Sequence, residues 1–226
     1  MSLKIAVIIS AFAEWSGVRS LFPDEKIRRF PYGECFDASL GRWPVTFFHA
    51  GWGKIASAGA IQYIIDHHKP DLIVNLGTCG GFEGVVNQGD VILVEKTFVY
   101  DIVELMGDPD ISSFYASSLD LSWLASPEPH PVWRSTLASA DSDLLPEKIP
   151  FLKAKGAIAA DWESGALAWV AKKNNVRLLI LRAVSDIIND KSGEAYDNIE
   201  LFNERSRVIM KLLVNQLPGW LDIVRL

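Results

Sequence analysis

The sequence predicts an α/β fold, because short apolar runs alternate with longer segments whose apolar residues recur at helical spacing. The clearest apolar run is residues 72–76. It lies between Pro70 and Gly77, as in a central strand covered on both faces. The chain has 226 residues, 49% of them hydrophobic, which suffices for one large domain with a substantial core. Since no repeat, linker or low-complexity tract divides the sequence, we expect a single domain over residues 1–226.

Composition and charge argue against several classes of function. The formal net charge is −6, and the basic residues are scattered rather than gathered in a stripe, which argues against a nucleic-acid partner. No apolar run reaches the roughly 18 residues of a transmembrane helix, and the chain begins with a strand-like segment rather than a signal peptide. We therefore expect a cytoplasmic protein without a membrane partner. The two cysteines, Cys35 and Cys79, and the lack of zinc-ligand spacing predict no disulfide framework, metal site or cofactor.

The first part of the chain predicts a strand, a helix and a pair of strands. The β-branched run 4–9 indicates the first strand, and the helix after it ends before Pro23. Residues 27–36 and 44–49 indicate two further strands. We expect these to pair as a hairpin with its turn at residues 40–42.

A helix over residues 50–66 follows, with an apolar face formed by Ile55, Ala58, Ile61, Ile64 and Ile65. Its glycine-containing start at residues 51–53 leaves helix N–H groups that can hold a phosphate or pack closely against the protein. We favour close packing, because the match to known phosphate loops is short. The strand over residues 72–76 then ends in a turn built from Gly77, Gly80 and Gly81, which tolerate positive φ or the close approach of a ligand.

The second half of the chain continues the alternation. We expect an extended run at 89–101 and a long loop at 107–130, with at most one short helix near Trp123. Further strands are expected at 133–140, 156–160 and 176–184, and helices at 161–174 and 198–217.

Chemically useful side chains stand just beyond four of the predicted strands. They are Glu14, Thr78, the acidic cluster at 141–143, and the pair Ser185 and Asp186, while Glu163 opens a helix. Since strand ends at one edge of an α/β sheet converge, these groups can share a pocket. Any one acid alone is more often structural, but several at the same kind of position favour a site.

Five short segments occur in an order and at a spacing that together form a strong family signal. They are Gly-Trp-Gly-Lys-Ile-Ala-Ser-Ala at 51–58, Asn-Leu-Gly-Thr-Cys-Gly-Gly at 75–81, Gly-Asp-Val-Ile-Leu at 89–93, Asp-Trp-Glu-Ser-Gly-Ala at 161–166 and Arg-Ala-Val-Ser-Asp at 182–186. Through them the chain resembles the purine/uridine phosphorylase superfamily and, within it, the 5′-methylthioadenosine/S-adenosylhomocysteine nucleosidases. The resemblance covers almost the whole chain and weakens only between about residues 107 and 150. It implies a three-layer α/β/α fold around a central mixed, twisted sheet.

The resemblance also implies cleavage of the N-glycosidic bond of a purine nucleoside, with a role for each of three acids. Glu14 matches the glutamate that activates the attacking water, and Glu163 matches the one that binds the ribose hydroxyls. Asp186 matches the aspartate that serves N7 of the purine. Departure of the base leaves positive charge on the ribose and negative charge on the base, which such groups stabilise. We therefore expect an ionised Glu14, and an Asp186 whose pKa is raised by burial beside Ser185.

Five further residues are implied to bind the substrate. Trp162 stands where a methionine lies under the sugar, and Ser185 stands beside the catalytic aspartate. Tyr196 matches an aromatic residue that closes over the sugar substituent. Thr78 and Gly80 come from the central glycine-rich segment.

Asp143 marks a departure from the family. It aligns with an aromatic residue that stacks on adenine, so stacking is lost there and a carboxylate is added. The departure leaves open a different base, as in futalosine hydrolases, or a larger substituent. We still include Asp143 among the substrate-binding residues.

Hydrolysis is favoured over phosphorolysis. Asn75 stands where phosphorylases carry an arginine, and Ala-Phe-Ala-Glu at 11–14 replaces their phosphate loop. A neutral amide and an added carboxylate would repel phosphate, and we expect no cation among the three acids. The alternatives are a phosphate-dependent purine nucleoside phosphorylase and a non-catalytic nucleoside-binding protein. The presence of all three acids argues against the second. The family also implies a homodimer whose loops complete the neighbouring pocket.

Overall fold

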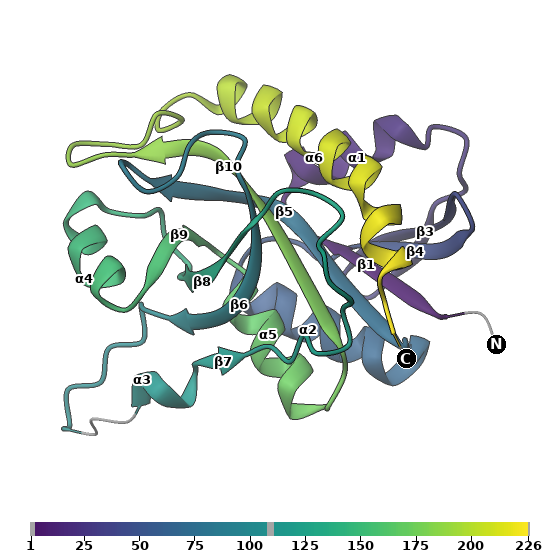
Figure 1. Cartoon of the computed structure of the whole chain (residues 1–226), viewed down its shortest axis with the longest axis horizontal. Helices are drawn as coiled ribbons and strands as arrows, with labels where there is room; N and C mark the ends of the chain where they lie inside the picture. Colours follow the sequence, from purple (N-terminus) through teal and green to yellow (C-terminus); the bar gives the residue numbers. More distant parts are fainter. Residues whose placement is uncertain (1–2, 108–110, 226) are drawn as a thin grey trace.

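The computed structural model describes residues 3–107 and 111–225. Within these ranges a mixed sheet lies between two pairs of helices, so the fold class expected from the sequence is confirmed (Figure 1). One face of the sheet is covered by α1 (Phe12–Leu21) and α6 (Ile199–Asp222). The other face is covered by α2 (Gly53–His68) and α5 (Ser164–Lys173).

The sheet is built from strands along the whole described chain. They are β1 (Ile5–Ile9), β2 (Arg28–Phe30), β3 (Gly33–Leu40), β4 (Trp43–His49), β5 (Leu72–Phe82), β6 (Val91–Val99), β7 (Ser117–Ser118), β8 (Trp133–Ser139), β9 (Ala157–Asp161) and β10 (Leu178–Ile188). Shorter helical elements are α3 (Ile111–Phe114), the 3₁₀ helix η1 (Pro146–Lys148) and α4 (Ile149–Ala154).

Parallel and antiparallel pairings are combined in the sheet. β1 lies parallel to β4 and β5, and β5 lies parallel to β10. β9 pairs antiparallel with β5, and β6 pairs antiparallel with β10. Because β6, β8 and β9 are also paired in series, the strands β5, β10, β6, β8 and β9 close into a ring. The pairing of β5 with β10 places residues 75–81 directly beside residues 180–187.

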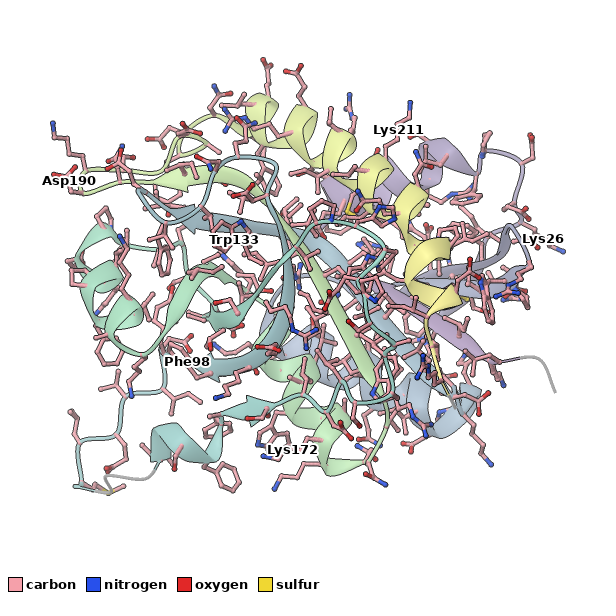
Figure 2. The ribbon with its side chains drawn as sticks, viewed as in Figure 1. Lys26, Phe98, Trp133, Lys172, Asp190 and Lys211 are labelled. Carbon is pink, nitrogen blue, oxygen red and sulfur yellow. The ribbon has the colours of Figure 1, made fainter. Side chains whose placement is uncertain are left out.

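The hydrophobic cores on the two faces of the sheet follow from the alternation of side chains along the strands. In β1, Ile5, Val7 and Ile9 pack with α1 and α6, whereas Ala6 and Ile8 pack toward α2 and α5. Burial on both faces explains why the strand has a continuous apolar sequence. Charged side chains such as Lys26, Asp190 and Lys211 point outward from the ribbon (Figure 2).

The glycine-rich segment is not the turn that its composition indicates. β5 continues through Gly77, Gly80 and Gly81, and none of the three has a positive φ. A Cβ at Gly80 would lie 2.3 Å from Ile188 Cδ1, and one at Gly81 would lie 2.7 Å from Val184 Cγ1. These glycines therefore serve the close approach of β10 rather than a change of chain direction.

Two predictions in the first half of the chain are also wrong in detail. Residues 27–36 form two strands, because a turn at residues 31–32 begins with a proline, which cannot donate to a strand ladder. On α2, Ile55 is 87% exposed. At about 100° per residue it lies about 180° from Ile64, which is buried against the sheet.

In the second half, the short helix of the long loop is α3, at Ile111–Phe114, and residues 121–124 near Trp123 are not helical. The last helix does not stop before Pro218 but continues through it to Asp222. Helix α4 was not predicted. Among the described residues, no helix combines the length and the hydropathy needed to cross a membrane.

Candidate active site

All nine residues singled out in the sequence line one cavity of about 610 Å³. They are Glu14, Thr78, Gly80, Asp143, Trp162, Glu163, Ser185, Asp186 and Tyr196. They come from α1, β5 and β10, from the segments that follow β8 and β9, and from the loop before α6. The convergence of the three acids expected from their positions after strands is therefore present.

Glu14 lies in the first turn of α1, and its carboxylate is held by backbone and hydroxyl donors. Its Oε1 accepts hydrogen bonds from the Thr78 backbone N–H at 2.6 Å and from Thr78 Oγ1 at 2.9 Å. Its Oε2 accepts one from the Ala11 backbone N–H at 3.1 Å. Glu14 is 2% exposed, so these donors take the place of water around a carboxylate that faces the cavity.

Arg182 lies among the acids, contrary to the expectation that no cation would be found there. Its side chain is fully buried on β10. Nη1 is 3.9 Å from Glu14 Oε1, and Nη2 is 3.6 Å from Glu163 Oε2. Burial acts to lower the pKa of Arg182, but the charges of Asp161, Glu163 and Glu14 outweigh it, so the pKa is raised and the guanidinium stays charged. The sequence signal was present in the 182–186 segment, where the arginine had no assigned role.

The donors of Arg182 are engaged by the protein. Nη2 donates to Asn75 Oδ1 at 2.9 Å and pairs with Asp161 Oδ2 at 2.9 Å, and Nε donates to Ser164 Oγ at 3.1 Å. Asp161 is fixed in turn by Ser139 Oγ, which donates at 2.6 Å, and by Ser164 Oγ. This buried network holds the guanidinium in one orientation behind the cavity wall.

Glu163 links Arg182 to the start of α2. Its Oε1 accepts from the Gly53 backbone N–H at 3.1 Å. Burial, aided by the charge of Asp161 and opposed by Arg182, raises the pKa of Glu163 to about 8. A carboxyl whose pKa is raised in this way can hold a proton near neutral pH, and it can then donate a hydrogen bond as well as accept one.

The first N–H groups of α2 are bound by the protein's own carboxyl groups. The Gly53 N–H is bound by Glu163, and the Lys54 N–H donates to Asp141 Oδ1 at 2.7 Å. The Lys54 ammonium pairs with Asp101, and its Nζ is 3.4 Å from Asp141 Oδ2. Of the two alternatives left open by the sequence, the helix start is closely packed against the protein's own carboxylates.

Asp186 stands at a β-bulge in β10. The pairing register with β5 shifts between Val184 and Asp186, so Ser185 is the extra residue. Burial raises the pKa of Asp186, while a hydrogen bond from Ser185, 2.7 Å to Oδ1, acts to lower it. The pKa is raised, as expected, but mainly by burial and to a smaller extent by the charges of Glu194 and Asp143, because the hydrogen bond from Ser185 favours the ionised form.

Tyr196 belongs to the Asp186 end of the cavity. Its hydroxyl donates to the Leu144 carbonyl at 2.5 Å, which ties the loop before α6 to the loop after β8. Burial, with the charges of Asp143 and Asp186, raises the pKa of Tyr196 far above the neutral range. The ring therefore forms a fixed part of the wall beside Asp186. Trp162 also lines the cavity and is 37% exposed.

The residues that form the cavity include no metal centre. Within residues 3–107 and 111–225, no group of three or more histidine, cysteine, aspartate or glutamate side chains is arranged to hold a metal ion. The arrangement can support acid–base chemistry. Asp186 is a candidate proton donor, Glu14 is a hydrogen-bonded carboxylate, and the carboxyl of Glu163 can donate or accept a hydrogen bond.

Comparison with known proteins identifies the class. The model of the phosphorylase superfamily matches residues 4–217, so the chain belongs to that superfamily. Within it, the chain is similar to the 5′-methylthioadenosine/S-adenosylhomocysteine nucleosidase of Bacillus velezensis. The two are 28% identical over 209 residues, which cover 86% of this chain and 90% of the relative.

Solved structures share the fold. The MTA/SAH nucleosidase of Streptococcus pneumoniae in complex with 8-aminoadenine superposes with a TM-score of 0.79 at 19% identity, covering 98% of this chain and 100% of that one. The 5′-methylthioadenosine/S-adenosylhomocysteine nucleosidase of Helicobacter pylori with butyl-thio-DADMe-Immucillin-A gives a TM-score of 0.79 at 17% identity, covering 96% and 99%.

Proposed function

We propose that this chain is an N-glycosyl hydrolase that cleaves a purine nucleoside substituted at the 5′ position, of the methylthioadenosine/S-adenosylhomocysteine type. The products are the free base and a ribose derivative. The observation that carries the proposal is that Glu14, Glu163 and Asp186 line one cavity, with the first two beside a shared buried arginine. The curated relative named above acts, by its name, on the same class of nucleoside.

Each acid has a chemical role that fits its surroundings. The raised pKa of Asp186 favours its protonated form, which can deliver a proton to N7 as the base departs. Glu163 binds the ribose hydroxyls, and Glu14 accepts a proton from the attacking water. Because Thr78 and Arg182 hold Glu14 in place, its carboxylate is oriented before the substrate arrives.

Hydrolysis is favoured over phosphorolysis by the charges around the sugar side of the cavity. Arg182 is engaged by Asn75, Asp161 and Ser164, and the first N–H groups of α2 are bound by carboxylates. An entering phosphate would find its usual donors taken and would face Glu14 across the cavity. A carboxylate cannot donate to a dianion, so the site disfavours phosphate.

The test is turnover of 5′-methylthioadenosine with and without inorganic phosphate. We expect the same rate of adenine release in both and a free reducing sugar as the second product. A rate that depends on phosphate, with ribose 1-phosphate formed, would identify a phosphorylase instead. Binding of the nucleoside without any cleavage would identify a nucleoside-binding protein, and preferential cleavage of futalosine would move the assignment to that class.

We further propose that the protein is a homodimer. Large apolar side chains are exposed beside the cavity mouth: Phe12 and Trp52 are in ring contact, and Ile55 stands one turn further along α2. The segment with the exposed Leu105 and Met106 begins beside α2, where Lys54 pairs with Asp101. Such a patch is typical of an interface. Light scattering should give a dimer mass, and Ile55→Lys should lower it, whereas a monomeric wild-type protein would contradict the proposal.

The remaining parts of the proposal concern organisation and location. The continuous sheet supports one domain over the whole chain, for which a single cooperative unfolding transition is the test. We also propose a cytoplasmic location, which cell fractionation would test.

A further inference from the structure

The Asp186 end of the cavity contains a carboxylate that the proposed chemistry does not use. Asp143 follows β8 and lines the cavity together with Asp186, Tyr100 and Tyr196. Among the described residues, no hydrogen bond to its carboxylate and no ion pair is found. Glu14, Glu163 and Asp186 differ in this respect, because each of them has a hydrogen-bonded partner in the protein. Asp143 is therefore an exposed acceptor in the wall of the cavity.

The charge of Asp143 acts on its neighbours across the cavity. It contributes to the raised pKa of Asp186, of Tyr196 and of Tyr100, behind burial as the main cause in each case. All four residues line the same cavity. The residues that line the cavity include no lysine, arginine or histidine among those described. Apart from water, a hydrogen-bond partner for Asp143 inside the cavity therefore has to come from the ligand, and it must be an N–H or O–H donor.

We propose that Asp143 is a specificity-determining residue whose carboxylate accepts a hydrogen bond from the exocyclic amino group of a 6-aminopurine. The inference rests on the proposed function, which places N7 of the base at Asp186. In a purine, N7 and the 6-substituent share one edge. A carboxylate that lines the same end of the cavity as Asp186 is therefore on the side of the 6-substituent when the base is seated with N7 at the proton donor.

The chemistry of the 6-substituent then decides between two classes of base. An amino group donates to a carboxylate, whereas the 6-oxo group of hypoxanthine or guanine is an acceptor and faces a like partial charge. Because Asp143 is exposed, solvent weakens the discrimination. We expect a preference for the 6-amino substrate of at least about tenfold, of the order of one hydrogen bond to a charged group. In this chain a hydrogen bond thus replaces the stacking contact as the means of recognising the base.

The experiment compares kcat/KM for 5′-methylthioadenosine and 5′-methylthioinosine in the wild-type protein, in Asp143→Asn and in Glu147→Gln. Asparagine has the same shape but can donate to a 6-oxo group as well as accept from an amino group, so we expect the preference to fall by about tenfold. Glu147→Gln removes the same charge from the same loop outside the cavity and should keep the wild-type ratio. An Asp143→Asn ratio within about twofold of wild type would overturn the inference.

A second measurement does not depend on turnover. Calorimetric titration with adenine and with hypoxanthine should show tighter binding of adenine to the wild-type protein and loss of that difference in Asp143→Asn. If no nucleoside is cleaved but this pattern holds, the proposed hydrolase function fails and the role of Asp143 stands. If the nucleoside is cleaved with a preference that ignores Asp143, only the inference fails. Failure of both bases to bind at millimolar concentration would also overturn it.

Discussion

Gly77 and Arg182 lie so close together that a Cβ on the glycine would stand 2.0 Å from Nη1 of the arginine. The same Cβ would be 2.9 Å from Glu14 Oε1. The two residues are paired neighbours on β5 and β10, so the guanidinium crosses directly over the glycine. The absence of a side chain at position 77 is what lets the cation reach the acids of the cavity.

Gly77→Ala should therefore damage both stability and activity. The added methyl group must displace the guanidinium or the strand, and overpacking of this kind costs about 1–3 kcal/mol. Urea unfolding and adenine release from 5′-methylthioadenosine measure the two effects. Gly80→Ala should cost less stability, because the atom nearest its Cβ is the terminal Cδ1 of Ile188, which can move aside. Equal stability of Gly77→Ala and wild type would contradict the role of the close approach.

Glu14→Gln should abolish most base release and leave the fold intact. The amide keeps the shape but cannot take a proton from water, and loss of such a group costs about 10²–10⁴ in rate. The measurement is kcat for 5′-methylthioadenosine, with circular dichroism to follow the fold. Glu204→Gln, an exposed change on α6, is the matched control. Full activity in Glu14→Gln would remove Glu14 from the mechanism.

Asp186→Asn should also abolish base release, and its effect has a pH signature. Burial raises the folded pKa of Asp186, so the protonated form is present at low pH and is lost as pH rises through that pKa. We therefore expect kcat/KM of the wild-type protein to fall as the pH rises through the pKa of Asp186. The residual activity of Asp186→Asn should lack the decline. If the decline of kcat/KM at high pH persists in Asp186→Asn and disappears in Glu163→Gln, the titrating group is Glu163 instead.

Glu163 should make the protein less stable as pH rises. Its pKa is about 8 in the folded state against an ordinary value of 4.5, so between these values the native state binds more protons than the unfolded one. The free energy of unfolding then falls with rising pH through this window and levels off above it. Urea unfolding at a series of pH values checks this. Glu163→Gln should flatten the slope, while Glu204→Gln should keep it. An equal slope in Glu163→Gln would show that another group is responsible.

Local sequence patterns predicted most elements but placed several boundaries wrongly. The apolar run at 72–76 identifies the central strand, yet the glycines after it indicate a turn that the structure does not have, because glycine in a sequence marks either a positive φ or a close approach. The pattern could not tell which of the two applied at residues 77–81. That depended on β10, which pairs with β5 across about a hundred residues of chain.

For the candidate site, too, the sequence identified some of the residues, and only the structure revealed the others. Residues that resemble family motifs identified Glu14, Glu163 and Asp186, and all three line the cavity. Arg182 was in one of those motifs but received no role, because a lone arginine in an apolar strand gives no sign of what it will meet. The hydroxyl of Tyr196 donates a hydrogen bond to the Leu144 carbonyl, and its role as a closing aromatic stays a prediction.

By itself the sequence determined the fold class, the alternation of elements and the acids that reach the cavity, since periodicity and short motifs are properties of neighbouring residues. Only the tertiary structure decided how the charges are distributed among them. It set Arg182 between Glu14 and Glu163, closed the start of α2 with carboxylates and left Asp143 without a partner in the described chain. The reason is physical: burial and the distances between charges govern proton affinity and anion binding, and both arise only when strands far apart in sequence are packed together.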